Sequence, residues 1–191
     1  MAPIFFLFKF ANLNYIETLM RKIIVIIFLF FLTGHAYGQK VNWISFDEAI
    51  KLTKENPKPM LIDVYTDWCG YCKKMDRITY NNKVISSYIN ENFYPVKLDG
   101  EQREDLIYKD YTFTYKSSGR TGYHEFAAAL LNGKLSYPTT VFMDEELGIL
   151  DRVPGYLSPD IMEQVITYFA DKKYKTETWQ DFVKSFVSNL N

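Results

Sequence analysis

Two cysteines stand three residues apart in the segment Asp67-Trp68-Cys69-Gly70-Tyr71-Cys72-Lys73-Lys74-Met75. An apolar run, Met60-Leu61-Ile62-Asp63-Val64-Tyr65, precedes this segment and is typical of a buried strand. After the cysteines, apolar and polar residues fall at helical spacing. The sequence therefore predicts that the Cys-x-x-Cys pair lies where a strand ends and a helix begins.

This position has a chemical consequence for Cys69. The first turn of a helix presents unpaired N–H groups and the positive end of the helix dipole, which favour a thiolate over a thiol. We expect Cys69 to be exposed, to have a lowered pKa and to attack disulfides as the thiolate. Cys72, about one turn further on, is spaced to attack the resulting mixed disulfide. The pair is therefore predicted to be redox-active.

Two other uses of the cysteine pair are weaker. A zinc site takes four ligands, but the chain has only these two cysteines, and His124 is its one histidine after the N-terminal segment. A purely structural disulfide across so short a loop would constrain the unfolded chain little. Redox chemistry remains the main interpretation, and it implies no metal and no organic cofactor beyond the Cys69–Cys72 pair itself.

The order of these features resembles the thioredoxin superfamily. The strand, Trp-Cys-x-x-Cys and helix are followed later by Tyr137-Pro138-Thr139 and another apolar strand. The Trp-Cys-Gly-Tyr-Cys-Lys sequence is most similar to secreted or periplasmic thioredoxin-like proteins. The resemblance runs from Val41 to Ala170, apart from an enlarged middle. It implies an α/β fold of three layers, α/β/α, around a central mixed sheet.

The resemblance also implies roles for single residues. Asp63 stands where thioredoxins carry a buried acid beneath the active site, and Lys97 matches the lysine that pairs with it. A buried acid has a raised pKa and is expected to exchange a proton with Cys72, with Lys97 opposing the shift. The alternative is that Asp63 is a solvated acid at a strand edge. Pro138 matches the cis-proline that presents backbone to substrate. Further substrate contacts are expected from Trp68, Gly70, Tyr71 and Tyr137.

The N-terminus has the form of a secretory leader. Arg21-Lys22 precede an apolar run over residues 23–32, and the small residues Ala36 and Gly38 follow. We predict cleavage before Gln39, which makes residues 1–38 a leader. Met20 is a second candidate for the start of the protein. The apolar run is too short for an ordinary membrane span, and an uncleaved anchor is the alternative.

Length and charge point to one exported domain over residues 39–191. The 191-residue chain fits one domain better than two. A formal net charge of −1 gives no indication of a nucleic-acid partner. We expect a monomer in the periplasm or outside the cell, where disulfides persist.

Local signals predict the other elements of a thioredoxin-like domain. Ser45 and Glu48 form a capping box for a helix that ends by Asn56. Asn81 or Asn82 opens another helix. The remaining predicted elements are strands over 41–44, 93–98, 139–143 and 149–153, and a helix over 160–170.

Two segments extend the minimal domain. In the insertion, about 99–134, alternating Tyr111, Phe113 and Tyr115 predict one strand over 110–116. Thr121 is expected to cap a helix that ends at Asn132-Gly133. The insertion either lines a substrate groove or, as we favour, packs its aromatic side chains on the domain. An apolar stripe over about 176–190 predicts a C-terminal helix that covers the sheet, with a docking or dimer helix as the alternative.

The predicted function is thiol–disulfide exchange on protein clients of the cell envelope. The Trp-Cys and Cys-Lys-Lys flanks look like the reducing branch of the superfamily, so a reductase is favoured. Electrons would then come from an upstream redox protein, for which a membrane-embedded carrier is a candidate. Cys-Gly-Tyr-Cys also resembles the periplasmic disulfide isomerase, which leaves an isomerase or oxidase as the alternative. A non-catalytic binding or folding-helper module is the third hypothesis.

Overall fold

The computed structural model describes residues 15–23, 40–119 and 121–190. The chain divides into two units, Met1–Gly38 and Gln39–Asn191. In the first unit, residues 15–23 form a helix. The predicted apolar segment of the leader beyond residue 23, and the cleavage position, lie outside the described residues. In the part of the chain that is described, no helix has the length and apolar character that a membrane crossing requires.

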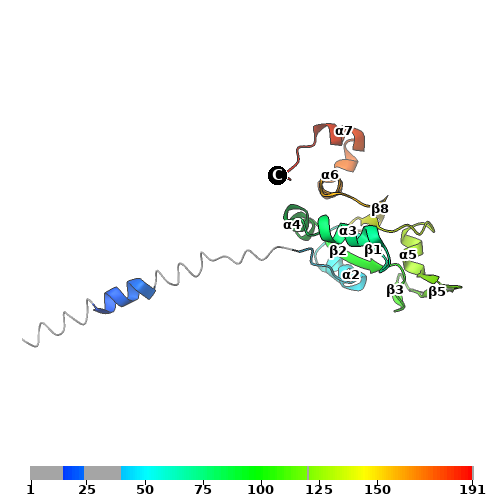
Figure 1. Ribbon diagram of the computed structural model, residues 1–191, viewed down its shortest axis with the longest axis horizontal. Coiled ribbons are helices and arrows are strands. Elements are labelled where there is room, and N and C mark those ends of the chain that lie inside the picture. Colours follow the sequence, from blue (N-terminus) through cyan, green and yellow to red (C-terminus); the bar gives the residue numbers. More distant parts are fainter. Residues whose placement is uncertain (1–14, 24–39, 120, 191) are drawn as a thin grey trace, which may run out of the picture. The chain divides into compact units, whose positions relative to one another are not determined.

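A mixed sheet of four strands organises the second unit (Figure 1). Its order is β2 (Tyr94–Asp99), β1 (Met60–Tyr65), β7 (Thr139–Met143) and β8 (Ile149–Pro154). Strand β1 runs parallel to β2 and antiparallel to β7, and β7 runs antiparallel to β8. The central position of β1 explains its burial on both faces and its nearly continuous apolar sequence.

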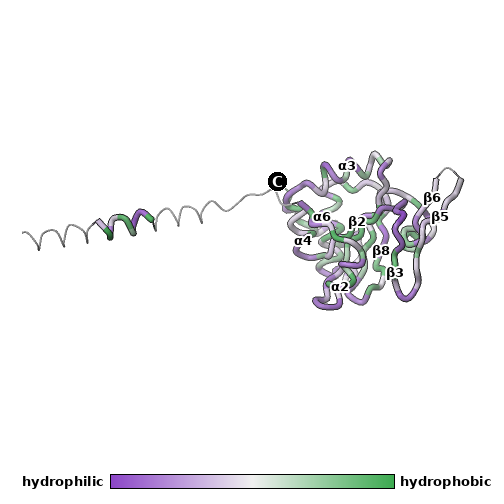
Figure 2. Tube along the Cα trace, turned by 90° about the horizontal axis from the view of Figure 1, so that it is seen from below, coloured by the Kyte–Doolittle hydropathy of each residue, from purple (hydrophilic) through white to green (hydrophobic). Residues whose placement is uncertain are grey.

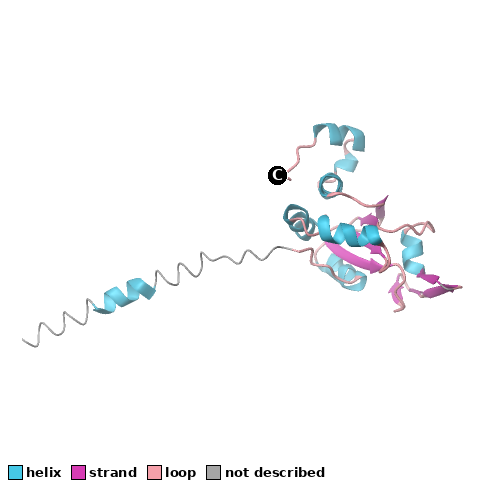
Figure 3. Ribbon diagram, in the orientation of Figure 1, coloured by secondary structure: helices cyan, strands magenta, loops and turns pink. Residues whose placement is uncertain are grey.

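Helices cover both faces of this sheet, as Figure 3 shows. One core contains side chains of α2 (Phe46–Glu55) and α5 (Glu125–Leu130). The other contains side chains of α3 (Gly70–Ile78), α4 (Lys83–Asn92) and α6 (Pro159–Ala170). Because successive strand residues face opposite sides, Ile62 enters the first core and Leu61 the second. The predicted three-layer α/β/α fold is confirmed.

The helix starts follow the predicted caps, but the first strand does not form. The Ser45 hydroxyl accepts the N–H of Glu48 at 3.2 Å, and the Asn82 side chain caps α4. The predicted strand over 41–44 is wrong: only a single bridge forms, between Ile44 and Val96 at the edge of β2. Val41 instead turns its side chain into the core shared with α4 and α6.

The insertion folds as two hairpins, so the prediction of one strand over 110–116 is wrong. The hairpins are β3 (Leu106–Tyr108) with β4 (Tyr111–Phe113), and β5 (Tyr115–Ser118) with β6 (Thr121–His124). The break falls at Thr114, whose N–H and hydroxyl both donate to Glu125. In Figure 2 the β5–β6 hairpin projects from the body of the domain.

The helix of the insertion begins later than predicted. Thr121 does not cap it, because this residue starts β6. His124 is the cap, and its Nδ1 accepts the N–H of Phe126 at 3.3 Å. The aromatic side chains of the insertion pack inward only in part: Tyr108 and Phe126 each contact the Phe46 ring of α2, whereas Tyr111 is 53% exposed.

The C-terminal helix is shorter than predicted and covers a helix rather than the sheet. After a 3₁₀ turn (Lys173–Lys175), α7 spans only Trp179–Ser185. Trp179 packs edge-on against Tyr168 of α6. Beyond the helix, the N–H of Asn189 and the hydroxyl of Ser188 donate to the buried Glu163 at 2.7 and 2.5 Å.

Candidate active site

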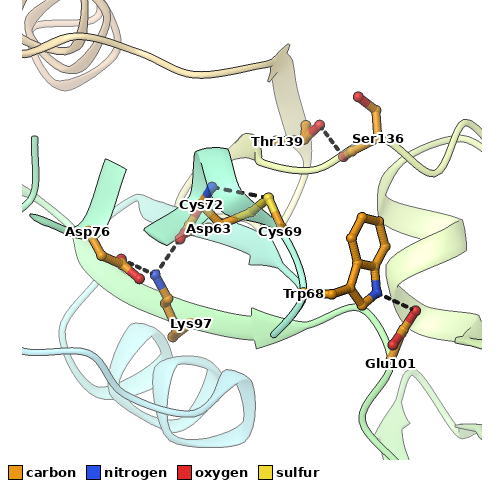
Figure 4. Close-up of a disulfide and its surroundings, with 9 residues drawn as sticks. All are labelled: Asp63, Trp68, Cys69, Cys72, Asp76, Lys97, Glu101, Ser136 and Thr139. Atoms are coloured by element: carbon orange, nitrogen blue, oxygen red, sulfur yellow. Dashed lines mark hydrogen bonds and ion pairs between the residues drawn. A yellow bond between two sulfur atoms is a disulfide. The ribbon is translucent and has the colours of Figure 1, made fainter. Parts of the chain in front are cut away.

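A disulfide joins Cys69 to Cys72 at the start of α3 (Figure 4). Cys69 is the N-cap residue of the helix, and its Sγ accepts the backbone N–H of Cys72 at 3.0 Å. The sulfur thus receives one of the unpaired N–H groups of the first helical turn, which is the contact that stabilises a thiolate.

The predicted exposure of Cys69 is wrong for this oxidised form. Cys69 is only 4% exposed and Cys72 only 2%. The reason is geometric: the disulfide and the Cys72 N–H hold the Cys69 sulfur against the first turn of α3. The residues beside it, Trp68 and Tyr71, are the exposed ones.

Beneath the disulfide, Asp63 and Lys97 form the predicted ion pair. They are cross-strand partners in β1 and β2, and Lys97 Nζ lies 2.6 Å from Asp63 Oδ2. Asp63 faces the α3 side of the sheet, as its neighbour Leu61 does, and is buried. The alternative of a solvated acid is therefore excluded. The same ammonium also contacts Asp76 of α3, so two carboxylates share one lysine (Figure 4).

Burial and charge act in opposite directions on this cluster. Burial raises the pKa of Asp63 more than Lys97 lowers it, and Asp76 adds to the rise. Burial lowers the pKa of Lys97, but its two carboxylate partners outweigh burial and raise it. A carboxyl group with a raised pKa is suited to exchange a proton near neutral pH.

Trp68 and Tyr137 form an aromatic rim next to the disulfide. The Trp68 indole N–H donates to Glu101 at 2.9 Å, and its ring meets Tyr137 edge-on at 5.9 Å. Burial raises the pKa of Tyr137 to about 12. Trp68 is 66% exposed, so much of the indole is open to solvent. Both its predicted role and a packing role fit this placement.

The Tyr137–Pro138 peptide bond is cis, as predicted. The Pro138 carbonyl accepts the N–H of Gly155 at 2.8 Å, and the Thr139 hydroxyl donates to the Ser136 carbonyl at 2.8 Å. These two bonds fix the loop that enters β7. Gly100 lies against the Tyr137 ring so closely that a Cβ at position 100 would stand 2.5 Å from the Tyr137 hydroxyl oxygen.

Comparison with known proteins identifies the fold family. A family model described as a thioredoxin-like domain matches residues 46–170. The chain belongs to the thioredoxin-like family. Among solved structures, a thioredoxin from Thermus thermophilus is similar, with a TM-score of 0.53 at 14% identity, over 70% of this chain and 89% of that one. A putative disulphide-isomerase from Bacteroides thetaiotaomicron has a TM-score of 0.51 at 20% identity, over 75% of this chain and 100% of that one.

Curated relatives match a smaller part of the thioredoxin-like domain. Spermatogenesis-associated protein 20 of Mus musculus is 32% identical over 94 residues, which are 49% of this chain and 12% of that protein. Uncharacterized protein B0495.5 of Caenorhabditis elegans is 30% identical over 94 residues, 49% of this chain and 13% of that one. The chain thus spans only about an eighth of the length of these relatives.

Four residues of this thioredoxin-like site were not predicted from the sequence: Asp76, Gly100, Glu101 and Tyr80, which is buried just after α3. Asp76 lies four residues after Cys72, one helical turn on, and this spacing was the available signal that it shares a face with the cysteine. Glu101 and Gly100 follow β2, whose end approaches the loop before Pro138 only in the folded domain. No local pattern marks them.

Gly70 and Tyr71, the two residues between the cysteines, form the outer surface of the site. Gly70 has open space where a Cβ would stand, and Tyr71 is 63% exposed with its ring 6.3 Å from that of Tyr156. Among the described residues, no group of three or more His, Cys, Asp or Glu side chains is arranged to hold a metal ion.

Proposed function

We propose that this protein catalyses thiol–disulfide exchange on protein clients in the cell envelope, acting as a reductase. One observation carries the proposal: the Cys69–Cys72 disulfide caps α3, and the buried Asp63 faces the side of the sheet that α3 covers. A nucleophile at a helix N-terminus and an acid of raised pKa beneath it are the two groups that this exchange requires.

The reaction has two steps. The Cys69 thiolate attacks a client disulfide, forms a mixed disulfide and releases the first client sulfur as a thiolate. Cys72 then gives its proton to Asp63 and attacks Cys69, so that the client leaves with its second sulfur reduced. An upstream redox protein must supply two electrons to reopen the Cys69–Cys72 disulfide after each cycle. Protein thiols and disulfides are therefore the partners of the site.

Replacement of each cysteine tests the activity. We expect Cys69→Ser to abolish reduction of a disulfide-bonded client protein, because no nucleophile remains. Cys72→Ser should stop after the first step and accumulate a mixed disulfide, visible as a higher-mass species on non-reducing gels. Full activity of Cys69→Ser would overturn the proposal and favour a non-catalytic binding module.

The direction of electron flow is tested by the reduction potential of the Cys69–Cys72 pair. The Trp-Cys and Cys-Lys-Lys flanks support a reductase, whereas Cys-Gly-Tyr-Cys supports an isomerase or oxidase. Equilibration against glutathione or dithiothreitol should give a value near the −270 mV of thioredoxin rather than near about −120 mV, the value of a strong oxidant. A value at the oxidising end would reverse the proposed direction.

A further inference from the structure

A buried tyrosine, Tyr80, lies behind the Asp63–Lys97 pair. It follows α3 and is only 3% exposed. Its hydroxyl lies close to Asp63 and to Thr140 of β7. Thr140 is the cross-strand partner of Asp63 on one side, as Lys97 is on the other. Tyr80 therefore completes the surroundings of the acid.

Three buried oxygen atoms meet at this place: Asp63 Oδ1, Tyr80 Oη and Thr140 Oγ1. Within the described part of the chain, none of them makes a hydrogen bond of normal geometry in this oxidised form. The other oxygen of Asp63 is held by Lys97 at 2.6 Å. Buried polar atoms nearly always have a hydrogen-bond partner, so three buried oxygens without one, close to the proposed reaction centre, require an explanation.

The charged form of Asp63 needs a donor for its second oxygen. The titratable groups that act on Asp63 are Lys97 from β2, Asp76 from α3 and Tyr80. Lys97 is engaged with the first oxygen, and Asp76 is itself an acceptor. Tyr80 is the titratable group of this set that is free to donate to Oδ1, and Thr140, which does not titrate, faces the same hydroxyl.

Tyr80 also lines a pocket together with the two charged partners Lys97 and Asp76, here called the Trp43 pocket. This pocket has a volume of about 450 Å³ and is lined by Lys40, Val41, Trp43, Lys73, Asp76, Arg77, Tyr80, Asn81 and Lys97. The Trp43 ring meets Tyr80 edge-on at 4.8 Å, and Lys97 Nζ lies 4.9 Å from the Trp43 ring centre. The cations Lys40, Lys73 and Arg77 on its wall are exposed.

The Trp43 pocket lies away from the client surface. In Figure 4, Asp76 and Lys97 lie on one side of Asp63, and Trp68 and Ser136 lie on the other. A client seated over Trp68 therefore leaves this pocket open.

We propose that Tyr80 is a positioning residue for Asp63, whose hydroxyl donates a hydrogen bond to the second carboxylate oxygen while that carboxylate waits to accept the Cys72 proton. The inference rests on the proposed thiol–disulfide exchange. In the step concerned, the Cys72 S–H bond breaks and its proton goes to Asp63. The Cys72 sulfur bonds to Cys69, and the electron pair of the broken Cys69–client bond leaves on the client thiolate.

The test is the pH profile of this step in Tyr80→Phe, which removes one oxygen and keeps the ring. Without its donor the charged Asp63 is less stable, so its pKa rises. In the plot of the client-release rate against pH, the acid limb should shift up by about one pH unit. On this limb the rate at a given pH is then about tenfold lower, while the rate on the alkaline plateau is unchanged. Infrared titration of the Asp63 carboxyl band, identified by its loss in Asp63→Asn, should show the same upward move.

Tyr94→Phe is the matched control. Tyr94 lies on the same strand as Lys97, and its hydroxyl donates to the Asn56 carbonyl at 2.9 Å. Loss of this hydroxyl should leave the acid limb of the pH profile in place. An acid limb and a carboxyl titration in Tyr80→Phe that coincide with those of the unmodified protein would overturn the inference. If Cys69→Ser remains active, the proposed function fails instead, and the two failures are distinguishable.

Discussion

At the scale of single residues, Asp63 is held in an environment that opposes its charge. It is buried on β1, and it shares Lys97 with Asp76. Burial raises its pKa above the value of 3.8 that it has in the unfolded chain. Below a pH of 3.8 the carboxyl group is protonated in both the folded and the unfolded state, so its burial as a charge does not reduce the stability of the fold. As the pH rises through the folded pKa, ionisation favours the unfolded state, so stability is lost.

Asp63→Asn should therefore stabilise the protein at neutral pH. We expect the free energy of unfolding to rise by about 1.4 kcal/mol for each unit by which the folded pKa of Asp63 exceeds the unfolded one, because the buried charge is gone while Lys97 keeps Asp76 as partner. The gain should shrink toward zero as the pH falls toward 3.8. Urea unfolding of both proteins over a pH series measures this. A gain that is constant with pH would show that the charge of Asp63 is not its origin.

Trp68→Ala should separate client binding from stability. The side chain is 66% exposed, so unfolding should change by less than about 0.5 kcal/mol. The kcat/KM for a client protein should fall about tenfold if the indole is a contact of the usual strength. Tyr111→Ala is the control, since this aromatic ring is also exposed but belongs to the insertion. An equal loss in both variants would place the client on the insertion as well.

The sequence predicted those site residues that carry a local signal. The cysteines stand between a strand and a helix pattern, and Asp63 is a charge within an apolar strand. Pro138 and Lys97 were predicted from the resemblance to the thioredoxin superfamily and not from a local signal. The spacing of Asp76 from Cys72 indicates only a shared helix face, and its contact with Lys97 depends on how α3 crosses the sheet. Tyr80 likewise comes close to Asp63 only because the segment after α3 packs near β1 and β7.

At the scale of elements, the insertion depends on one buried histidine. His124 is fully buried, caps α5, and donates its backbone N–H to the Gly100 carbonyl at 2.8 Å. The period-two pattern over 110–116 could not reveal the break at Thr114, because that break is made by Glu125, eleven residues further along the chain. Long-range side-chain contacts, not local propensity, therefore set the strands of the insertion.

The insertion should open in acid. Burial lowers the pKa of His124, so its contribution to stability is present above the unfolded pKa of about 6.5 and is lost as the pH falls below it. We expect amide protection of β6 and α5 to fall up to about tenfold per pH unit in this range, after correction for intrinsic exchange. Strand β1 is the internal control. Hydrogen exchange that is equally pH-dependent in His124→Gln would assign the effect to other groups.

At the scale of the whole molecule, the leader hypothesis makes a simple prediction. The chain recovered from the periplasm or medium of expressing cells should begin at Gln39, as intact mass and N-terminal sequencing will show. A chain that retains residues 1–38 and sediments with membranes would support the uncleaved anchor. The control is Ala36→Arg with Gly38→Arg, which removes the small residues required at the cleavage site.

The close contact between Gly100 and the Tyr137 ring has an evolutionary consequence. A Cβ at position 100 would lie 2.5–2.7 Å from the Tyr137 hydroxyl and ring atoms, so any larger residue there excludes tyrosine at position 137 in its present rotamer. The two positions, 37 residues apart in sequence, are therefore expected to change together among descendants of this gene. A lineage that loses the glycine needs either a smaller side chain before its cis-proline or another rotamer of Tyr137.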